Sequence, residues 1–313
     1  MSLKTILRIF LISSVLLIIC FNPLRAADRV VVSVIYSADI EPYQLCWEGF
    51  KTFLGGKNVA IWVSKYNLKE QTPEKIIPQI SGEKPQLIFC LGTKAASLAR
   101  LTFKEIPIIY ALVLEPDEVK DSNMTGVLMD IPAKMKMEEI KRILPGRHSM
   151  GIIYSEAAGT QAVELVQTCM GLGLKAVAKR VSSEKDLPEA VQSMNDKIDC
   201  FLMVPDPKIY FPQSVKYLLA ESMKDKIPVV GLSRYYTKDG ALLSFDCDYQ
   251  DLGSQAGEIA LKVLDGAKPK DITPVLPRKL NYSLNTSVAD KLGIKMDPEI
   301  VKGATYIYDE NSK

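Results

Sequence analysis

Histidine is nearly absent from this chain of 313 residues, in which His148 is the only one. His148 directly precedes an apolar run expected to form a strand, which places it at the sheet edge opposite the one where α/β proteins bind ligands. Ser-His-Asp and Cys-His mechanisms therefore lack a base, and a histidine-rich metal site is excluded. A P-loop is also absent, and GLGL (171–174) indicates a helix end rather than a dinucleotide-binding turn. We expect no catalytic residue, no bound metal and no cofactor.

A charge excess of either sign and a paired-cysteine pattern are missing as well. The chain carries 39 basic and 37 acidic residues without a long block of one sign, so nothing favours a nucleic-acid partner. The cysteines show no CxxC spacing, and most are expected to be buried as small apolar side chains. Those that follow the N-terminal segment are Cys46, Cys90, Cys169, Cys200 and Cys247.

The N-terminus has the three parts of an export signal. Basic residues precede the apolar run 9–21, and small residues follow it. That run is shorter than the roughly 20 residues that a membrane span needs. We therefore predict a signal peptide over residues 1–26, cleaved after Ala26, and a mature protein in the periplasm. A lipid anchor at Cys20 is not expected, because Ile19 stands where lipid attachment requires a small residue.

From residue 29 onward, short β-branched runs alternate with helical patterns. Alternation of this kind is typical of a parallel sheet with helices on both faces. The first set of expected strands covers 29–37, 58–66, 85–92 and 106–113, and the expected helices between them cover 41–56, 72–80 and 93–101.

The pattern restarts after residue 145, and its landmarks return in the same order. VSVIYSAD (32–39) is followed by MGIIYSEA (150–157) about 115 to 120 residues later, a shift far longer than a solenoid repeat. Two further pairs of strands repeat at a similar shift. The sequence therefore predicts two similar doubly wound parallel-sheet lobes of the α/β class. We expect the first lobe to comprise 27–128 plus 249–274, and the second 129–248 plus 275–313.

Three extended segments are expected to pass between the lobes and form a hinge beside a cleft. They cover residues 123–130, 240–248 and 277–285, and the last leads into a helix that Thr286 is expected to cap. Within the second segment, Asp246 and Asp248 share one face of an extended chain while Cys247 points the other way, so a three-ligand cluster is excluded.

The residues around this second crossing have separate expected roles. Asp246 is expected to line the cleft, and Asp248 or Asp251 to cap the following helix. The small residues Gly253 and Gly257, together with Ala256, would let that helix pack closely against the first lobe.

Candidate ligand-binding residues lie in the loops that follow the strands, because open α/β sheets bind ligands there. Thr93, which follows Gly92 and opens a helix, could hold a carboxylate, while Glu115 and Asp206 could balance an ammonium group. The other reading of these polar residues is that they cap helices. The loops are centred on Ser37 to Asp39, Gly92 and Thr93, Glu115, Ser155 to Ala157, Asp206, and Ser233 to Tyr235.

Several stretches together resemble one family. The most specific is DYQDLGSQAG (248–257) followed by LDGAKP (264–269), and IPIIYALVLEP (106–116) and AVQSMNDKIDCFLMVPD (190–206) match as well. With the export signal and the two lobes, these stretches resemble the ABC-transporter substrate-binding proteins of the tryptophan/tyrosine type. The resemblance covers essentially the whole mature chain.

This resemblance implies a type I periplasmic-binding-protein fold that closes on a small ligand and presents it to an ABC permease with its ATPase. It implies a monomer without enzymatic activity and an amino-acid-like ligand, with aromatic amino acids suggested by the family name. Three loops depart from the family's pattern, SRYY, LEP and SEAAGT, and Arg234 in the first would favour a ligand with an additional anionic group. Ligand contacts carry over only at matching loops, which contain Ser37, Asp39, Gly92, Thr93, Glu115, Ser155, Gly159, Thr160, Asp206 and Ser233.

Two alternatives remain open. Cofactor-independent racemases of acidic amino acids also have two similar lobes, each of which supplies one cysteine, and Cys90 and Cys200 fall in equivalent segments. Both cysteines lie within or just before a strand, however, which favours a place in the core. The second alternative is a ligand-sensing module for a separately encoded signalling partner, which would share the fold.

Overall fold

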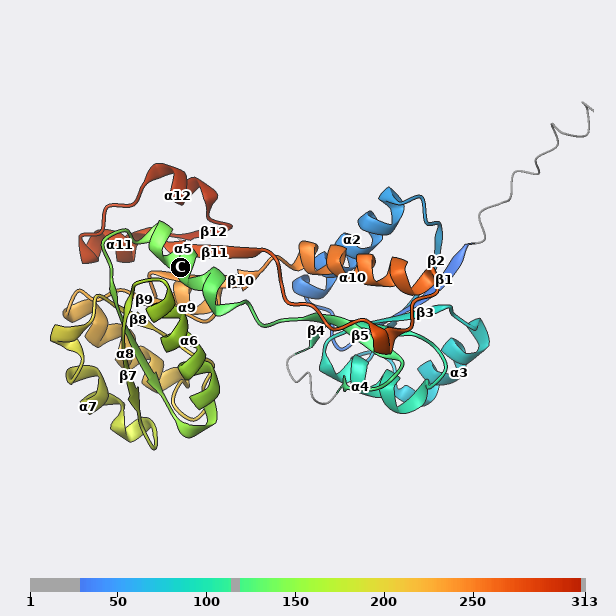
Figure 1. The fold of residues 1–313 in the computed structure, drawn as a ribbon, viewed down its shortest axis with the longest axis horizontal. Helices are drawn as coiled ribbons and strands as arrows, with labels where there is room; N and C mark the ends of the chain where they lie inside the picture. Colours follow the sequence, from blue (N-terminus) through green and yellow to red (C-terminus); the bar gives the residue numbers. More distant parts are fainter. Residues whose placement is uncertain (1–28, 114–118, 311–313) are drawn as a thin grey trace, which may run out of the picture.

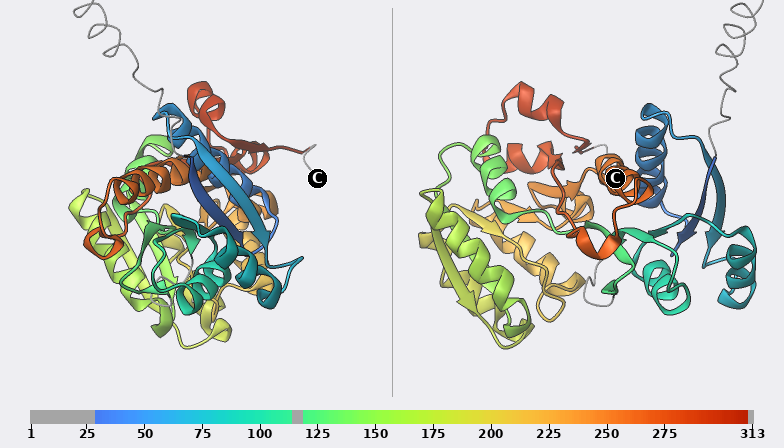
Figure 2. Two further views of the ribbon diagram at one scale, coloured as in Figure 1. Left: turned by 90° about the vertical axis from the view of Figure 1, so that its right-hand side faces the viewer. Right: turned by 45° about the vertical axis from the view of Figure 1, so that its right-hand side comes forward.

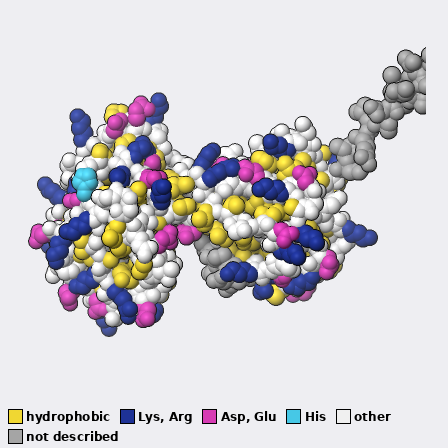
Figure 3. Space-filling model, in the orientation of Figure 1, with side chains coloured by type: hydrophobic (Ala, Val, Ile, Leu, Met, Phe, Trp, Pro, Cys, Tyr) yellow, Lys and Arg dark blue, Asp and Glu magenta, His cyan; other side chains and the backbone are white. Residues whose placement is uncertain are grey.

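The computed structural model describes residues 29–113 and 119–310. The predicted signal peptide, its cleavage site and Cys20 lie outside these ranges, as does Glu115. The described chain forms two lobes side by side, joined by a narrow waist that is also visible in the space-filling view (Figures 1 and 3).

The first lobe is built on a five-stranded parallel sheet in the order β2-β1-β3-β4-β5. Side chains of β3 alternate between two cores: Leu87, Phe89 and Leu91 belong to one, and Ile88 and Cys90 to the other. Its strands are β1 (Val30–Tyr36), β2 (Ile61–Asn67), β3 (Leu87–Leu91), β4 (Ile108–Val113) and β5 (Met124–Leu128). Its helices are α2 (Glu41–Gly56) and α10 (Tyr249–Leu264), which share the first core, and α3 (Pro73–Glu83) and α4 (Thr93–Thr102), which share the second.

The second lobe has a seven-stranded sheet in the order β12-β11-β10-β9-β8-β6-β7. Its strands are β6 (Ser149–Tyr154), β7 (Lys175–Arg180), β8 (Cys200–Leu202), β9 (Val229–Gly231), β10 (Leu243–Cys247), β11 (Leu280–Asn285) and β12 (Tyr306–Tyr308). Its helices are α5 (Ala133–Ile143), α6 (Gly159–Gly171), α7 (Leu187–Gln192), α8 (Pro212–Lys224), α9 (Arg234–Asp239), α11 (Thr286–Leu292) and α12 (Pro298–Gly303). The prediction of two α/β lobes is confirmed.

One strand pairing departs from the expected parallel order. β11 runs antiparallel to β10, and β12 is parallel to β11. The reason is where the chain re-enters the sheet. The chain leaves β10 at the end of the sheet that faces the first lobe, and it starts β11 at that same end. Two neighbouring strands, one of which ends where the other begins, must run in opposite directions.

The connections between the lobes are shorter than the extended segments predicted for them. The first runs from the end of β5 at Leu128 to the start of α5 at Ala133, the second is Asp248 alone, and the third runs from Val275 to the start of β11. The connections touch one another, because the Cys247 thiol donates to the carbonyl of Met129 at 3.4 Å and the Asp248 amide to that of Lys279 at 3.4 Å. The division of the chain into 27–128 plus 249–274 and 129–248 plus 275–313 stays a prediction.

Helix α10 follows a strand of the second lobe but packs against α2 of the first (Figure 2). The two helices approach so closely that a Cβ added to Gly253 would lie 1.8 Å from the carbonyl oxygen of Cys46. A Cβ on Gly49 of α2 would lie 1.9 Å from the carbonyl oxygen of Gln250. Only glycine fits at these two positions, so the expected close packing of α10 is confirmed.

The helix caps settle two sequence predictions. The Asp248 carboxylate accepts from the Asp251 amide at 2.9 Å and so caps α10. Asp251 instead pairs with Arg278 at 2.9 Å, which fastens the third connection to α10. The prediction that Thr286 caps α11 is wrong, because Thr286 is already helical and the Asn285 side chain accepts from the Val288 amide at 3.0 Å.

Within the described ranges, no helix is both long and apolar enough to cross a membrane. No group of three or more His, Cys, Asp or Glu side chains in the same ranges is arranged to hold a metal ion.

Candidate functional site

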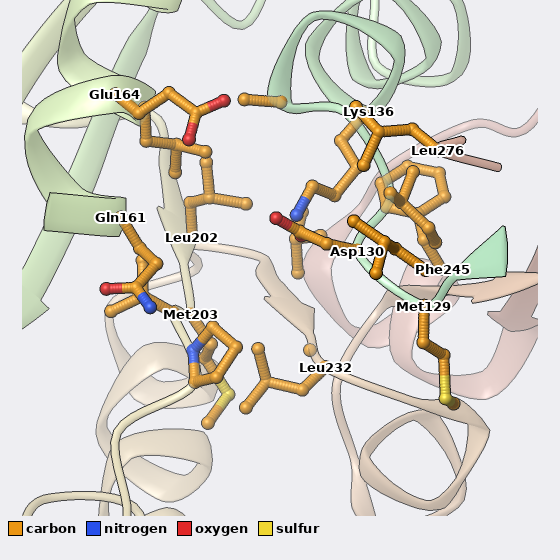
Figure 4. Close-up of a pocket in the computed structure, with 18 of the residues that line it drawn as sticks. Met129, Asp130, Lys136, Gln161, Glu164, Leu202, Met203, Leu232, Phe245 and Leu276 are labelled. Atoms are coloured by element: carbon orange, nitrogen blue, oxygen red, sulfur yellow. The ribbon is translucent and has the colours of Figure 1, made fainter. Parts of the chain in front are cut away.

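A cavity of about 490 Å³ opens at the edge of the second lobe, against the connections between the lobes (Figure 4). Its walls combine strand ends of both sheets, the first turn of α5, the first two turns of α6, and residues of the first and third connections. The lining residues are Val113, Leu128 to Ile131, Ala133, Lys136, Gln161, Glu164, Leu165, Leu202 to Pro205, Val230 to Leu232, Phe245 and Leu276.

The cavity has an apolar floor and a charged rim. Leu202, Met203 and Phe245 form part of the floor, and they come from β8, the residue after it, and β10. Asp130 and Lys136 face Glu164 and Gln161 across the opening (Figure 4). A molecule in this space would meet apolar side chains below and charges of both signs at its rim.

The polar residues of the rim are positioned by the helices α5 and α6. In α6, Gln161, Glu164 and Leu165 are three and four residues apart, so they share one face of the helix. In α5, Ala133 and Lys136 share a face in the same way, and the adjacent Met137 is fully buried. Lys136 is therefore anchored by a helix whose other side belongs to the core, while its ammonium group reaches the cavity.

The predicted residues of the first lobe form a turn that is bonded within that lobe. The Ser37 hydroxyl accepts from the Ala95 amide at 2.9 Å and so caps the start of α4. Gly92 has a φ of +92°, and a Cβ there would lie 2.2 Å from the Tyr43 hydroxyl oxygen. Gly92 is thus needed for the turn to form, and the helix-capping reading holds for Ser37. Thr93 is the first residue of α4.

Asp206 and Ser155 are brought together in the second lobe. The Asp206 carboxylate accepts from the Ser155 amide at 2.6 Å, from the Ser155 hydroxyl at 3.1 Å and from the Lys208 amide at 3.1 Å. Both side chains are buried. This pairing joins the loops after β6 and β8, and it commits the Asp206 carboxylate to its own lobe. Gly159 and Thr160 open α6, directly before the cavity-lining Gln161.

Asp246 is the last but one residue of β10, directly after the cavity-lining Phe245 and two residues before the second connection at Asp248. Its carboxylate accepts from the Arg234 amide at 3.1 Å and from the Tyr249 hydroxyl at 3.3 Å. Burial raises the pKa of the Asp246 carboxyl above its ordinary value, and these two hydrogen bonds oppose that rise. Ser233 is the residue before α9, and its side chain makes no capping bond.

Of the predicted residues that the structure describes, none lines this cavity. Several lie one residue from a lining position: Thr160 precedes Gln161, Asp206 follows Pro205, and Asp246 follows Phe245. Ligand binding by the predicted residues therefore stays a prediction. Asp39 lines a second cavity of about 490 Å³ on the first lobe, with Trp47 and Lys65 among its other walls.

The racemase alternative required Cys90 and Cys200 to reach the cleft as reactive thiols. Both side chains are fully buried, Cys90 within β3 and Cys200 at the start of β8. Burial raises the pKa of the Cys90 thiol and raises that of Cys200 to about 12. Neither cysteine can supply a thiolate to the cavity in this arrangement.

We expect the native mature protein to react with less than one equivalent of a soluble disulfide reagent within minutes. All five cysteines of the described chain are free and buried, which keeps them protonated and out of reach. After unfolding in denaturant without reductant, the same sample is expected to release five thiols, as counted by absorbance. Fewer thiols after unfolding would show that a disulfide forms in the exported protein.

The comparisons with known proteins agree with the two-lobe fold. The sequence profile of the family described as ABC transporter substrate binding protein matches residues 45–307. The chain therefore belongs to the ABC transporter substrate-binding proteins, whose members work outside the cytoplasm.

Individual relatives cover most of the chain. A tyrosine-binding protein of Clostridioides difficile is 26% identical over 276 residues, covering 84% of this chain and 79% of the relative. The ligand-free, open structure of a substrate-binding protein with adhesive properties from Clostridium difficile has a TM-score of 0.73 at 20% identity, covering 90% of this chain and 100% of the other. An ABC domain from Streptococcus pneumonia in complex with L-Trp has a TM-score of 0.55 at 23% identity, covering 89% and 99%. The type I periplasmic-binding-protein fold is thereby confirmed.

Proposed function

We propose that this protein is the solute-binding component of an ABC importer. It captures an amino-acid-like ligand in the cavity against the connections between its lobes and delivers the ligand to a membrane permease with its ATPase. The observation that carries the proposal is the combination of an apolar floor with a rim of opposite charges in one cavity of about 490 Å³. No covalent step is part of the proposal.

The rim matches the two charges of a free α-amino acid. The Lys136 ammonium would bind the carboxylate of the ligand, and Asp130 or Glu164 on either side of the opening would accept from its ammonium group (Figure 4). An apolar or aromatic side chain would then lie on the floor beside Phe245. The name of the tyrosine-binding relative and the L-Trp complex of the structural relative support an aromatic side chain.

Closure of the lobes would complete the site. Among the described residues of the first lobe, only Val113 and Leu128 line the cavity, so a ligand there would be held mainly by the second lobe. Rotation about the three connections would bring the loops at Ser37, Gly92 and Thr93 toward the ligand. A ligand that touches both lobes only in the closed form shifts the population toward that form. We place the protein in the periplasm as a monomer.

The proposal is tested by thermal unfolding of the mature protein with L-tyrosine, L-tryptophan and L-phenylalanine. A ligand at one hundred times its Kd stabilises the native state by about 2.7 kcal/mol, which raises the Tm of a chain of this size by roughly 5–10 °C. N-acetyl-L-tyrosine amide, which has neither charge of the free amino acid, is the control and should leave the Tm unchanged. If none of the three amino acids shifts the Tm at millimolar concentration, the proposed ligand class is wrong.

A further inference from the structure

One ion pair joins the lobes directly. The Arg234 Nη2 atom of α9 lies 2.9 Å from the Glu41 Oε2 atom of α2. Helix α9 belongs to the second lobe and α2 to the first, and the two residues are 193 positions apart. This contact is therefore a noncovalent link between the described parts of the lobes, in addition to the chain connections.

Arg234 is held in place by its own lobe. Its guanidinium group lies over the ring of Tyr306 in β12, 4.4 Å from the ring centre, and over that of Tyr235 at 5.5 Å. Its amide donates to Asp246 at 3.1 Å. The side chain is 22% exposed, and the hydrogen bond that it donates to Glu41 raises the pKa of the guanidinium group, which stays charged at any ordinary pH. Arg234 is thus fixed at the level of β10 and cannot follow Glu41 freely.

Glu41 is also held, although it is more exposed. It is the first residue of α2, where a carboxylate is favoured by the helix dipole, and Pro42 follows it. Helix α2 is fastened to α10 by the close contact at Gly253. The pair therefore connects a helix of the first lobe to a helix of the second, and a rotation of one lobe against the other would change the distance between its charges.

We infer that the Glu41–Arg234 ion pair is a latch that stabilises the separation of the lobes seen here and opposes their closure. The inference rests on the proposed hinge closure. A direct contact at 2.9 Å is lost when its two anchored ends move by a few ångströms, so it contributes to one arrangement of the lobes only. Removing an interaction that exists in one state shifts the population toward the other.

The latch is tested first without any ligand, by small-angle X-ray scattering of the mature protein. Glu41→Gln is expected to reduce the mean radius of gyration, because more molecules close. Glu48→Gln is the matched control, since Glu48 lies in the same helix and its ion pair is with Lys51 of that helix, not with the second lobe. The radius of gyration of the wild type should also fall when sodium chloride is raised to 1 M, whereas that of Glu41→Gln should not change.

The affinity for L-tyrosine provides a second test of the latch. Because closure no longer has to break the pair, the Kd of Glu41→Gln is expected to be about two- to fivefold lower than that of the wild type, the range of an exposed ion pair. Arg234→Met should have the same effect, which guards against a role of Glu41 in the helix alone. An unchanged radius of gyration in both variants would overturn the latch. Failure of every amino acid to bind, with the radius changed as expected, would count against the proposed ligand and leave the latch standing.

Discussion

Replacing Gly253 with valine is expected to lower the free energy of unfolding by about 3 kcal/mol, the upper end for overpacking of a well-packed contact. The added Cβ would lie 1.8 Å from the carbonyl oxygen of Cys46. That oxygen belongs to the backbone of α2 and cannot rotate away, so α2 and α10 must separate. For a chain of this size the Tm should fall by roughly 10 °C, as measured by circular dichroism.

Gly55→Ala is the matched control for this prediction. Gly55 lies in α2, the helix that Gly253 of α10 contacts, but a Cβ added to Gly55 would meet nothing within 4 Å. The substitution is expected to be neutral or to stabilise the protein by about 0.5–1 kcal/mol, because alanine favours a helix over glycine. Equal stability of the two variants would show that the helices are not in close contact at Gly253.

Replacing Lys136 with methionine is expected to weaken the binding of L-tyrosine by about 10- to 100-fold, the effect of losing one hydrogen bond to a charged group. Lys136 lines the cavity, and its ammonium group points into it (Figure 4). Methionine keeps an unbranched side chain that is one atom shorter and removes the charged ammonium group, so the Tm of the ligand-free protein should change little. Isothermal titration calorimetry measures the affinity.

Lys134→Met serves as the control for the loss of a positive charge from the same helix. Lys134 is exposed and makes only a surface ion pair with Glu138 at 3.8 Å. Its replacement should leave the affinity within about twofold of the wild type, since exposed pairs contribute little. Similar losses in both variants would indicate a general electrostatic effect and would remove Lys136 from the proposed site.

The lobes could be predicted from the sequence because they depend on periodic patterns. Buried strands such as Leu87–Leu91 are continuous apolar runs, and amphipathic helices such as α2 have clear boundaries. The antiparallel return of β11 could not be predicted in this way, because the direction of a strand depends on where the chain re-enters the sheet. The cap of α11 was misplaced by one residue, since Asn285 and Thr286 are both good capping residues.

None of the predicted ligand-binding residues that the structure describes lines the cavity. Polar residues at strand ends stand out in a sequence, but Ser37 and Asp206 use their polar groups to bind their own lobe. The cavity floor consists of residues such as Leu202 and Phe245, which in a sequence look like any other core position. Which apolar side chain faces a cavity depends on the spacing of the lobes, and that spacing cannot be predicted from local composition.

Helix α10 also determines when the first lobe can be finished during synthesis. All five strands of that lobe have been made by residue 128, yet the apolar face that includes Phe50 and Phe89 stays uncovered on the α10 side until residue 264 has emerged. By then the chain has already passed through β10 of the second lobe. A chain that is cut short before residue 264 therefore carries a complete sheet with an exposed face, which makes it prone to aggregation and to degradation.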